Sequence, residues 1–210
     1  GQLGAITDVQ HVFRNMYNLL AYSDRDALTG LLNRKSFDES FYRLASLAPV
    51  PDSAAVEERR HVTATQYALA VMDIDHFKLV NDRFGHLIGD EVLLLMSQLM
   101  GHCFRFYDQL YRFGGEEFVL LLPDTRAAEA ALLAEQLLQQ LAASSFSLLP
   151  GHQVTLSAGV AELYADGASG GKQRLRALLG AADQALYRAK EAGRNRVEAA
   201  TAEDWGARPE

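Results

Sequence analysis

Two amphipathic segments open the chain. Residues 6–20 repeat apolar side chains at spacings of three and four, which predicts a helix with one hydrophobic stripe. Residues 33–48 show a second helical pattern. The first segment precedes a polar turn at Ser23 and Asp24, so we expect a linker or dimerisation helix over residues 1–23. Packing of this helix against its own domain is the alternative.

Further along, short apolar runs alternate with longer amphipathic segments. Glycines between two of the runs indicate a hairpin, and the prolines in residues 49–64 indicate a surface loop. The alternation predicts one α/β layer domain over residues 24–200 and a disordered tail over residues 201–210. Strands are predicted at 67–72, 110–113, 118–122, 154–161 and 196–197, and helices at 87–104, 126–143 and 172–192.

Composition narrows the class of protein. The formal net charge of -7 argues against nucleic-acid binding and against contact of this fragment with a membrane surface. The single cysteine, Cys103, cannot form an internal disulfide, so a cytoplasmic location is expected. No run reaches the ~18 apolar residues of a membrane span. Because the chain begins at Gly1, we expect a fragment, and an anchor in the parent protein stays open.

Two pairs of acidic residues are candidates for a metal site. Asp73 and Asp75 follow an apolar run, and side chains two residues apart on a strand project to the same side. Glu116 and Glu117 follow two glycines, which permit close approach of phosphates to the backbone. Oxygen ligands suit a hard cation such as Mg²⁺. The alternatives are a solvated strand end with a helix N-cap for the first pair and an ordinary acidic turn for the second.

Polar residues between the two acidic pairs, and two cations near the C-terminus, have the chemistry to bind a nucleotide. An aspartate such as Asp90 can accept from the N1–H and N2 amine of guanine, and the amide of Asn81 can donate to O6 or N7. Lys78, Lys190 and Arg194 suit phosphate oxygens. The alternatives are helix caps for Asn81 and Asp90 and solvated surface charges for the three cations.

Four blocks of sequence occur in the order found in one protein family. The block D-A-L-T-G-L-L-N-R begins at Asp26, and R-F-G-G-E-E-F begins at Arg112. Residues 73–90 fit D-x-D-x-F-K-x-x-N-D-x-x-G-H-x-x-G-D, and residues 189–197 fit A-K-x-x-G-R-N-x-V. Together the blocks resemble the GGDEF family, the diguanylate cyclases, over about residues 24–198.

The resemblance implies a fold and an activity. The fold would be α/β (α+β), with a central mixed sheet of about five strands flanked by helices, similar to nucleotidyl cyclases and polymerase palms. The activity would be condensation of two GTP molecules into cyclic di-GMP, with release of two pyrophosphates and with two Mg²⁺ (or Mn²⁺) ions per active site. One domain would hold one GTP, so catalysis would need a homodimer.

The resemblance also implies roles for single residues. Metal binding would fall to Asp73, the Ile74 carbonyl, Glu116 and Glu117. One of the two glutamates would help deprotonate the attacking 3′-hydroxyl group, and Glu116 is the first choice. Asn81 and Asp90 would read guanine, and His86 would lie near the ribose or base. The residues implied in substrate binding are Phe77, Lys78, Asn81, His86, Asp90, Gly114, Gly115, Lys190 and Arg194.

A second ligand site is implied by Arg105 and Asp108. Their R-x-x-D spacing, shortly before the signature, resembles the family's product-inhibition site, so feedback inhibition by cyclic di-GMP is expected. Three rival functions fit parts of the pattern: a non-catalytic receptor that keeps this site, a cyclase that uses ATP or mixed nucleotides, and a dimerisation module. The intact signature disfavours the first, Asp90 disfavours the second, and the metal-acid spacing disfavours the third.

Overall fold

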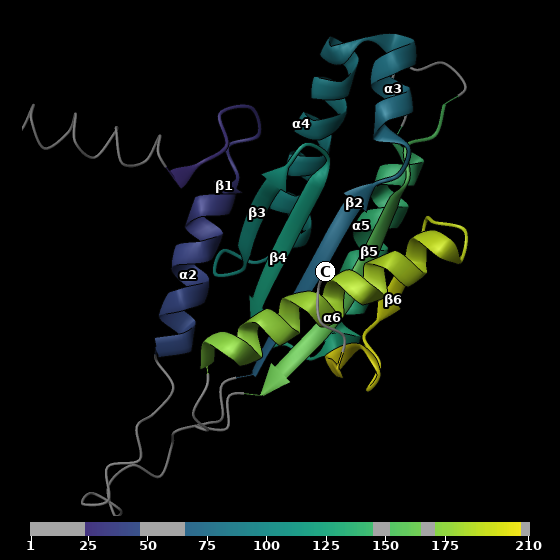
Figure 1. Ribbon diagram of the computed structural model, residues 1–210. Helices are drawn as coiled ribbons and strands as arrows, with labels where there is room; N and C mark the ends of the chain where they lie inside the picture. The colour runs from purple at the N-terminus through teal and green to yellow at the C-terminus, as the bar shows by residue number, and fades with distance from the viewer. Residues whose placement is uncertain (1–23, 47–65, 145–151, 165–170, 207–210) are drawn as a thin grey trace, which may run out of the picture.

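The computed structural model describes residues 24–46, 66–144, 152–164 and 171–206 (Figure 1). The predicted N-terminal helix and the predicted loop at 49–64 lie outside these residues. The elements are β1 (Leu32–Asn33), α2 (Arg34–Ser46), β2 (Gln66–Ile74), α3 (Phe77–Phe84), α4 (His86–Cys103), β3 (Gln109–Gly114), β4 (Glu117–Pro123), α5 (Ala127–Ala143), β5 (Leu156–Tyr164), α6 (Gly171–Glu191), β6 (Val197–Ala199) and the 3₁₀-helix η1 (Asp204–Gly206).

The strands form a mixed six-stranded sheet in the order β1-β3-β4-β2-β5-β6. Strand β2 is central and runs antiparallel to β4 and β5, and the edge strands β1 and β6 run parallel to β3 and β5. The predicted mixed sheet flanked by helices is confirmed. It has six strands instead of about five because the two-residue β1, too short to leave a pattern in the sequence, pairs with β3.

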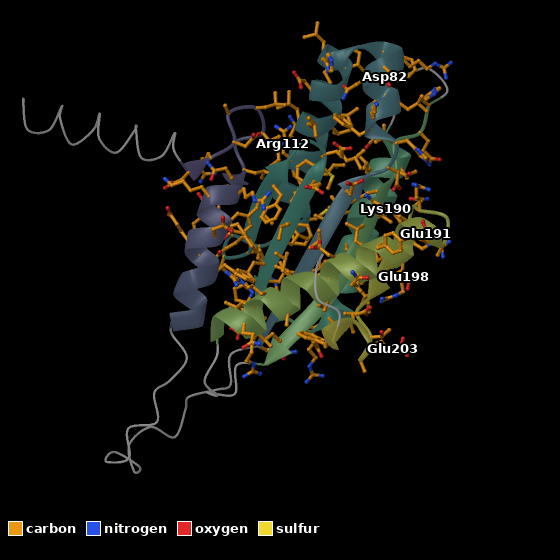
Figure 2. All side chains as sticks on the ribbon, in the orientation of Figure 1. Asp82, Arg112, Lys190, Glu191, Glu198 and Glu203 are labelled. Atoms are coloured by element: carbon orange, nitrogen blue, oxygen red, sulfur yellow. The ribbon has the colours of Figure 1, made fainter. Side chains whose placement is uncertain are left out.

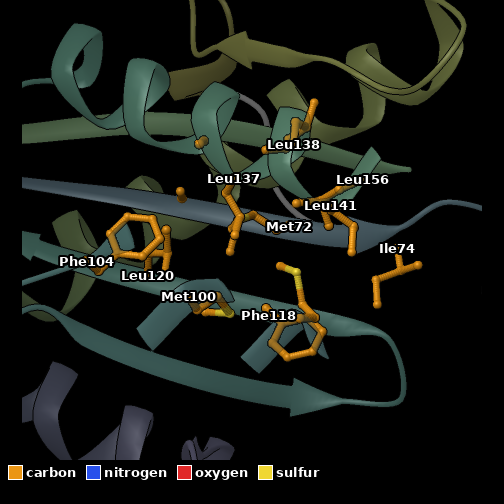
Figure 3. Packing of buried hydrophobic residues seen from close by; sticks show 14 of the residues in the cluster. Met72, Ile74, Met100, Phe104, Phe118, Leu120, Leu137, Leu138, Leu141 and Leu156 are labelled. Carbon is orange, nitrogen blue, oxygen red and sulfur yellow. The ribbon is translucent and has the colours of Figure 1, made fainter. Parts of the chain in front are cut away.

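Helices cover both faces of the sheet (Figure 1). Successive side chains of a strand point to opposite faces, so Met72 belongs to one core cluster and Val71 to the other. The first cluster includes side chains of α3, α4 and α5, of which Figure 3 labels members from α4 and α5, and the second includes side chains of α2 and α6. Every residue from 68 to 74 is buried. This double coverage explains why β2 reads as a continuous apolar run.

The chain after β6 differs from the predicted disordered tail. Asp204 is buried and accepts hydrogen bonds from the backbone and hydroxyl of Thr201. Arg188 of α6 pairs with Asp204 and also donates to the carbonyl of Ala199 over 2.9 Å. The prediction is therefore wrong for residues 201–206, because the ion pair between Arg188 and the buried Asp204 holds them against α6. Residues 207–210 lie outside the described part of the chain.

The remaining boundaries differ by a few residues. The eight-residue α3 was not predicted, because so short a helix shows little periodicity. Strand β5 begins at Leu156 and not at Val154, although the Val154 side chain is buried. In the described ranges, no helix combines the length and apolar character that a membrane crossing requires.

Candidate active site

Asp73 stands where three elements meet. It is the next-to-last residue of β2 and lies opposite Glu117 of β4 in the sheet register. The Nζ atom of Lys190, from α6, lies 3.0 Å from Asp73 Oδ1. Burial raises the pKa of Asp73, Lys190 opposes the rise, and the charges of Glu116 and Glu117 add to it. The alternative of a solvated strand end is wrong here, because only 8% of Asp73 is exposed.

The β3–β4 hairpin brings both signature glutamates to this end of β2. Gly115 has a φ of 49°, in the left-handed region that favours glycine. The backbone N–H of Ile74 donates to the carbonyl of Glu116 over 3.3 Å, so the turn lies against the end of β2. Glu117 is exposed and Glu116 is half-buried, which leaves both carboxylates accessible from solvent. Asp73, Glu116 and Glu117 thus lie together where β2 ends and β4 begins.

Arg112 fixes the position of the signature turn. Its Nε and a second guanidinium nitrogen donate to the carbonyl of Gly115 over 3.1 and 2.8 Å. Its third nitrogen donates to both oxygens of Asp26, over 3.0 and 3.1 Å. Partial burial opposes ionisation of Asp26, but hydrogen bonds from Thr29 and Arg112 outweigh it and lower the pKa of this carboxyl. An ion pair, in which one guanidinium nitrogen is shared between both oxygens of Asp26, therefore ties the turn to the opening block of the sequence.

Asn81 and Asp90, the predicted readers of guanine, lie close together on two packed helices. A Cβ atom added at Gly89 would lie 2.0 Å from Oδ1 of Asn81, so the carboxamide rests directly against the α4 backbone beside Asp90. The cap alternative is wrong, because Asn81 and Asp90 lie inside α3 and α4, whose N-caps are His76 and Gly85. Both side chains are partly exposed and so accessible to a ligand.

The predicted phosphate contacts occupy two elements around Asp73. Lys78 is exposed in the first turn of α3, where free backbone N–H groups favour anions. The ring of Phe77 is buried in the core, so a phosphate can meet only the backbone of this residue. His86 is the exposed first residue of α4. Lys190 lies in the last turn of α6 (Figure 2). The partly buried Arg194 follows three residues after the end of this helix.

A glycine in β5 lets α6 approach the sheet closely enough to deliver Lys190. A Cβ atom at Gly159 would lie 2.0 Å from the carbonyl oxygen of Ala182 and 2.2 Å from the backbone nitrogen of Leu186. Only glycine fits this contact without movement of the helix. The sequence showed a glycine inside a strand, a signal of close backbone approach.

Asp75 lies on the same side of the sheet as Asp73, but its carboxylate binds other partners. Ser157, which pairs with Asp73 in the register of β2 and β5, donates a hydrogen bond to Asp75. Its carboxylate is buried and accepts hydrogen bonds from Thr155 Oγ1, Ser157 Oγ and the backbone nitrogen of Asn195. The expected shared side therefore agrees with the structure, but Asp75 binds the chain itself, whereas Asp73 meets Lys190.

Asp183 is a further acid at the site that the sequence reading missed. Although the residue as a whole is exposed, desolvation of its carboxyl and the nearby charge of Glu117 raise the pKa of Asp183 to about 6. Asp183 precedes Lys190 by seven residues on α6, close to two full helical turns, which places both on one face. That spacing was the available signal in the sequence.

The acids fit a divalent metal held jointly with a substrate, and not a closed protein cage. In the described ranges, no three histidine, cysteine or acidic side chains converge into a ready-made metal site. Mg²⁺ is usually bound by one or two carboxylates together with substrate phosphates and water. Buried Asp73, with its raised pKa and with Glu117 opposite it, supplies oxygen donors that a cation would favour.

Arg105 and Asp108 lie at the other end of β3 from the signature turn. They occupy the loop between α4 and β3, where the backbone nitrogen of Arg105 donates to Asp108 Oδ2 over 2.7 Å. The Arg105 guanidinium donates to the hydroxyl of Tyr107 over 2.7 Å, and the Phe106 ring is fully exposed. The structure thus keeps this pair together on the surface, and separate from the acids around Asp73.

Comparisons with known proteins agree with this geometry. The family described as "Diguanylate cyclase, GGDEF domain" matches residues 23–196. The chain is 41% identical to diguanylate cyclase DgcM of Escherichia coli K12 over 175 residues, which are 83% of this chain and 38% of DgcM. It is 36% identical over 189 residues to the response regulator PleD of Caulobacter vibrioides, over 87% of this chain and 37% of PleD. The chain therefore spans less than half of these relatives.

Solved structures show the same architecture. The coiled coil and GGDEF domain of DgcB from Caulobacter crescentus, in complex with c-di-GMP, superposes with a TM-score of 0.78 at 28% identity. The match covers 93% of this chain and 95% of that one. The family match spans most of the chain, DgcM is similar over 83% of the chain, and the DgcB fold agrees. The chain belongs to the GGDEF domain family of diguanylate cyclases.

Proposed function

We propose that this domain is a diguanylate cyclase that converts two GTP molecules into cyclic di-GMP and two pyrophosphates. The observation that carries the proposal is the register of β2 and β4, which sets Asp73 opposite Glu117 with Lys190 3.0 Å away. Acids beside a cation at the edge of a sheet suit the transfer of a nucleotidyl group. The named cyclases among the relatives support the same reaction.

In this reaction the 3′-hydroxyl oxygen of each GTP attacks the α-phosphorus of the other. One P–O bond forms, the bond to pyrophosphate breaks, and the hydroxyl proton must leave. Glu116 is our first choice as the acceptor of that proton, because it is half-buried beside the end of β2. Lys78, Lys190 and Arg194 would hold the triphosphate and offset the charge on the departing pyrophosphate.

Members of this family are generally dependent on a divalent metal. Asp73, the Ile74 carbonyl, Glu116 and Glu117 would hold Mg²⁺ or Mn²⁺, with two ions per site as our specific expectation. Such a metal, when bound, lowers the cost of ionising the 3′-hydroxyl group and neutralises charge on the phosphates. Before it binds, Lys190 partly offsets the repulsion among the acids.

Guanine selectivity would come from Asn81 and Asp90. The carboxylate accepts from the donor edge that guanine presents and adenine lacks, while the carboxamide donates to the guanine acceptors. The Asn81 carboxamide lies against Gly89, the residue before Asp90, which supports a shared base site. We therefore propose GTP, and not ATP, as the substrate.

Each domain would bind a single GTP, so the two halves of the reaction require two domains facing each other. We propose that the active species is a homodimer and that residues 1–23 promote it. Binding of cyclic di-GMP at Arg105 and Asp108 would provide feedback inhibition. The complex of the DgcB GGDEF domain with c-di-GMP supports product binding by this kind of domain.

The test is GTP turnover measured across a range of protein concentrations with Mg²⁺. Cyclic di-GMP should form, and the rate per protein should rise with concentration if a dimer is the active species. Glu117→Gln should abolish product, whereas Glu203→Gln, an exposed acid on the C-terminal segment (Figure 2), should not. Absence of product from the unaltered protein at high concentration would leave a non-catalytic receptor. Product from ATP alone would refute the substrate assignment.

A further inference from the structure

We propose that Asp75 is a positioning residue that fixes the closing turn, residues 192–196, and thereby presents Lys190 and Arg194 to the triphosphate. The inference rests on the proposed function for its consequence in catalysis. The contact between Asp75 and the turn stands independently of that function. It gives the second aspartate of the D-x-D block a role distinct from that of Asp73.

Both oxygens of the Asp75 carboxylate accept hydrogen bonds, from donors in two distant segments. Its Oδ1 accepts from Ser157 Oγ over 2.7 Å. Its Oδ2 accepts from Thr155 Oγ1 over 2.8 Å and from the backbone nitrogen of Asn195 over 3.1 Å. Only 5% of the residue is exposed. A carboxylate so far from water is tolerated when hydrogen bonds replace its hydration, and here they do.

The segment that Asp75 holds has an unfavourable backbone. Arg194 and Asn195 have consecutive φ values of 64° and 48°, both in the left-handed region. Residues other than glycine enter this region at a cost, which is smallest for asparagine and larger for arginine, and two consecutive such residues need surroundings that fix them. Two bonds do so: Arg194 N–H donates to the Ala189 carbonyl over 2.9 Å, and Asn195 N–H donates to Asp75. Asp75 is thus the side chain that secures the second strained residue.

The same turn adjoins the predicted phosphate contacts. Arg194 is its central residue, and Lys190, which contacts Asp73, ends the helix that leads into it. The next bond along the chain runs from Ala158 N–H to the Arg196 carbonyl over 2.9 Å and joins the turn to β5. Release of Asn195 would free the turn between these two supports. Arg194 would then lose its defined direction, and the substrate would lose a cation held in place.

The principal variant is Asp75→Asn, which keeps the size of the side chain but replaces one acceptor oxygen with a donor. Ser157 can rotate its hydroxyl to accept from the new NH2 group, so the remaining oxygen can still face the Asn195 N–H, but the bond to Asn195 loses its charge-assisted character. We expect the dissociation constant for GTP to rise about fivefold, the effect of replacing a charge-assisted bond with a neutral one. Ser157→Ala is the matched control, because it removes a donor to Asp75 and leaves the Asn195 contact intact. It should change the constant less than about threefold.

A double-mutant cycle separates positioning from general stability. If Asp75 acts through Arg194, then Asp75→Asn should add little to the loss of GTP affinity already caused by Arg194→Ala. Full additivity of the two effects would overturn the proposal. So would an unchanged GTP affinity in Asp75→Asn at an unchanged fold.

Amide hydrogen exchange tests the contact without any catalytic readout. In the unaltered protein the Asn195 amide should exchange at least about tenfold more slowly than an unstructured amide, and Asp75→Asn should speed it selectively. Exchange at the unstructured rate in the unaltered protein would overturn the proposal even if the variant did not fold. Protein that binds GTP but forms no cyclic di-GMP would refute the proposed function and leave this inference standing.

Discussion

Replacement of Gly89 with alanine should weaken the binding of guanine while the fold remains stable. Gly89 is buried in α4, and a Cβ atom there would lie 2.0 Å from Oδ1 and 3.0 Å from Cγ of Asn81. Ordinary contacts between heavy atoms lie near ~3.5 Å, so the Asn81 carboxamide must retreat by more than about 1 Å. The ring of Phe77, with Cζ at 3.2 Å, need move only by a few tenths of an ångström.

The size of the effect on stability and on GTP binding depends on how the Asn81 side chain moves. Asn81 is a flexible side chain, so relieving the clash costs the fold little, and alanine is favoured over glycine inside a helix by about 1 kcal/mol. We therefore expect the thermal midpoint of unfolding to stay unchanged or to rise slightly. A displaced Asn81 loses its hydrogen bond to the base, which is worth about 1–2 kcal/mol when a polar group is left unpaired. That corresponds to a rise of about 5- to 30-fold in the dissociation constant for GTP.

The assay is GTP binding and turnover by the Gly89→Ala variant, with Gly101→Ala as the matched control. Gly101 lies on the same helix, and a Cβ atom there meets nothing within 4 Å, so its replacement should leave GTP binding unchanged. Asn81→Ala should lower affinity by a similar factor, and the combination with Gly89→Ala should lower it no further. Unaltered GTP affinity in Gly89→Ala would refute the assignment of Asn81 to the base.

Three further predictions address other parts of the site. Gly159→Ala should lower the thermal midpoint of unfolding, because the new methyl group meets the α6 backbone at 2.0 Å and overpacking costs about 1–3 kcal/mol. Gly180→Ala is the control and should leave the midpoint unchanged, because a Cβ atom there meets nothing within 4 Å. Equal midpoints for the two variants would contradict the reasoning. Asp183 has a raised pKa of about 6, so its favourable contribution is complete below about pH 4 and is lost as the pH rises through 6. Without metal, the unfolding free energy of Asp183→Asn minus that of the unaltered protein should be about 1 kcal/mol larger at pH 7 than at pH 4, a figure reduced for solvent exposure. Denaturant titrations that give the same difference at both pH values would disprove this. Arg105→Ala should keep basal turnover and raise the concentration of cyclic di-GMP needed for half-inhibition at least about tenfold; unchanged inhibition would refute the site.

Local patterns in the sequence predicted the elements that form the sheet and its covering helices. The run at 67–72 is the core of β2, and the hairpin at residues 110–122 agrees with β3 and β4 within a few residues. Such elements can be predicted because their buried apolar side chains recur at regular intervals along the chain. The short α3 and the two-residue β1 have too few residues to repeat anything, and they form because neighbouring parts of the fold support them.

Long-range partners explain what the sequence did not yield at the site. Asp75 reaches donors that lie 80, 82 and 120 residues away in the chain, and Arg112 meets Asp26 across 86 residues. No spacing in a single sequence encodes such pairs. Asp183 is different, because it lies seven residues before Lys190 on a predicted helix, and this spacing alone predicts that both residues share one helix face. Motif blocks located the functional residues, while the contacts that orient them required the structure.

In the described site, one set of charged residues is accessible to ligands, and a second set holds the neighbouring turns in place. Glu117 is exposed and Glu116 half-buried, so the signature acids can adapt to a metal and its phosphates. The turns beside them are held by charged groups that meet little solvent: Arg112 binds the carbonyl of Gly115, and Asp75 binds the amide of Asn195. A binding site gains affinity when its frame is ordered before the ligand arrives, because less entropy is lost on binding. Loss of either support should therefore weaken substrate binding more than it weakens the fold, whereas loss of Glu117 should remove turnover and leave the frame intact.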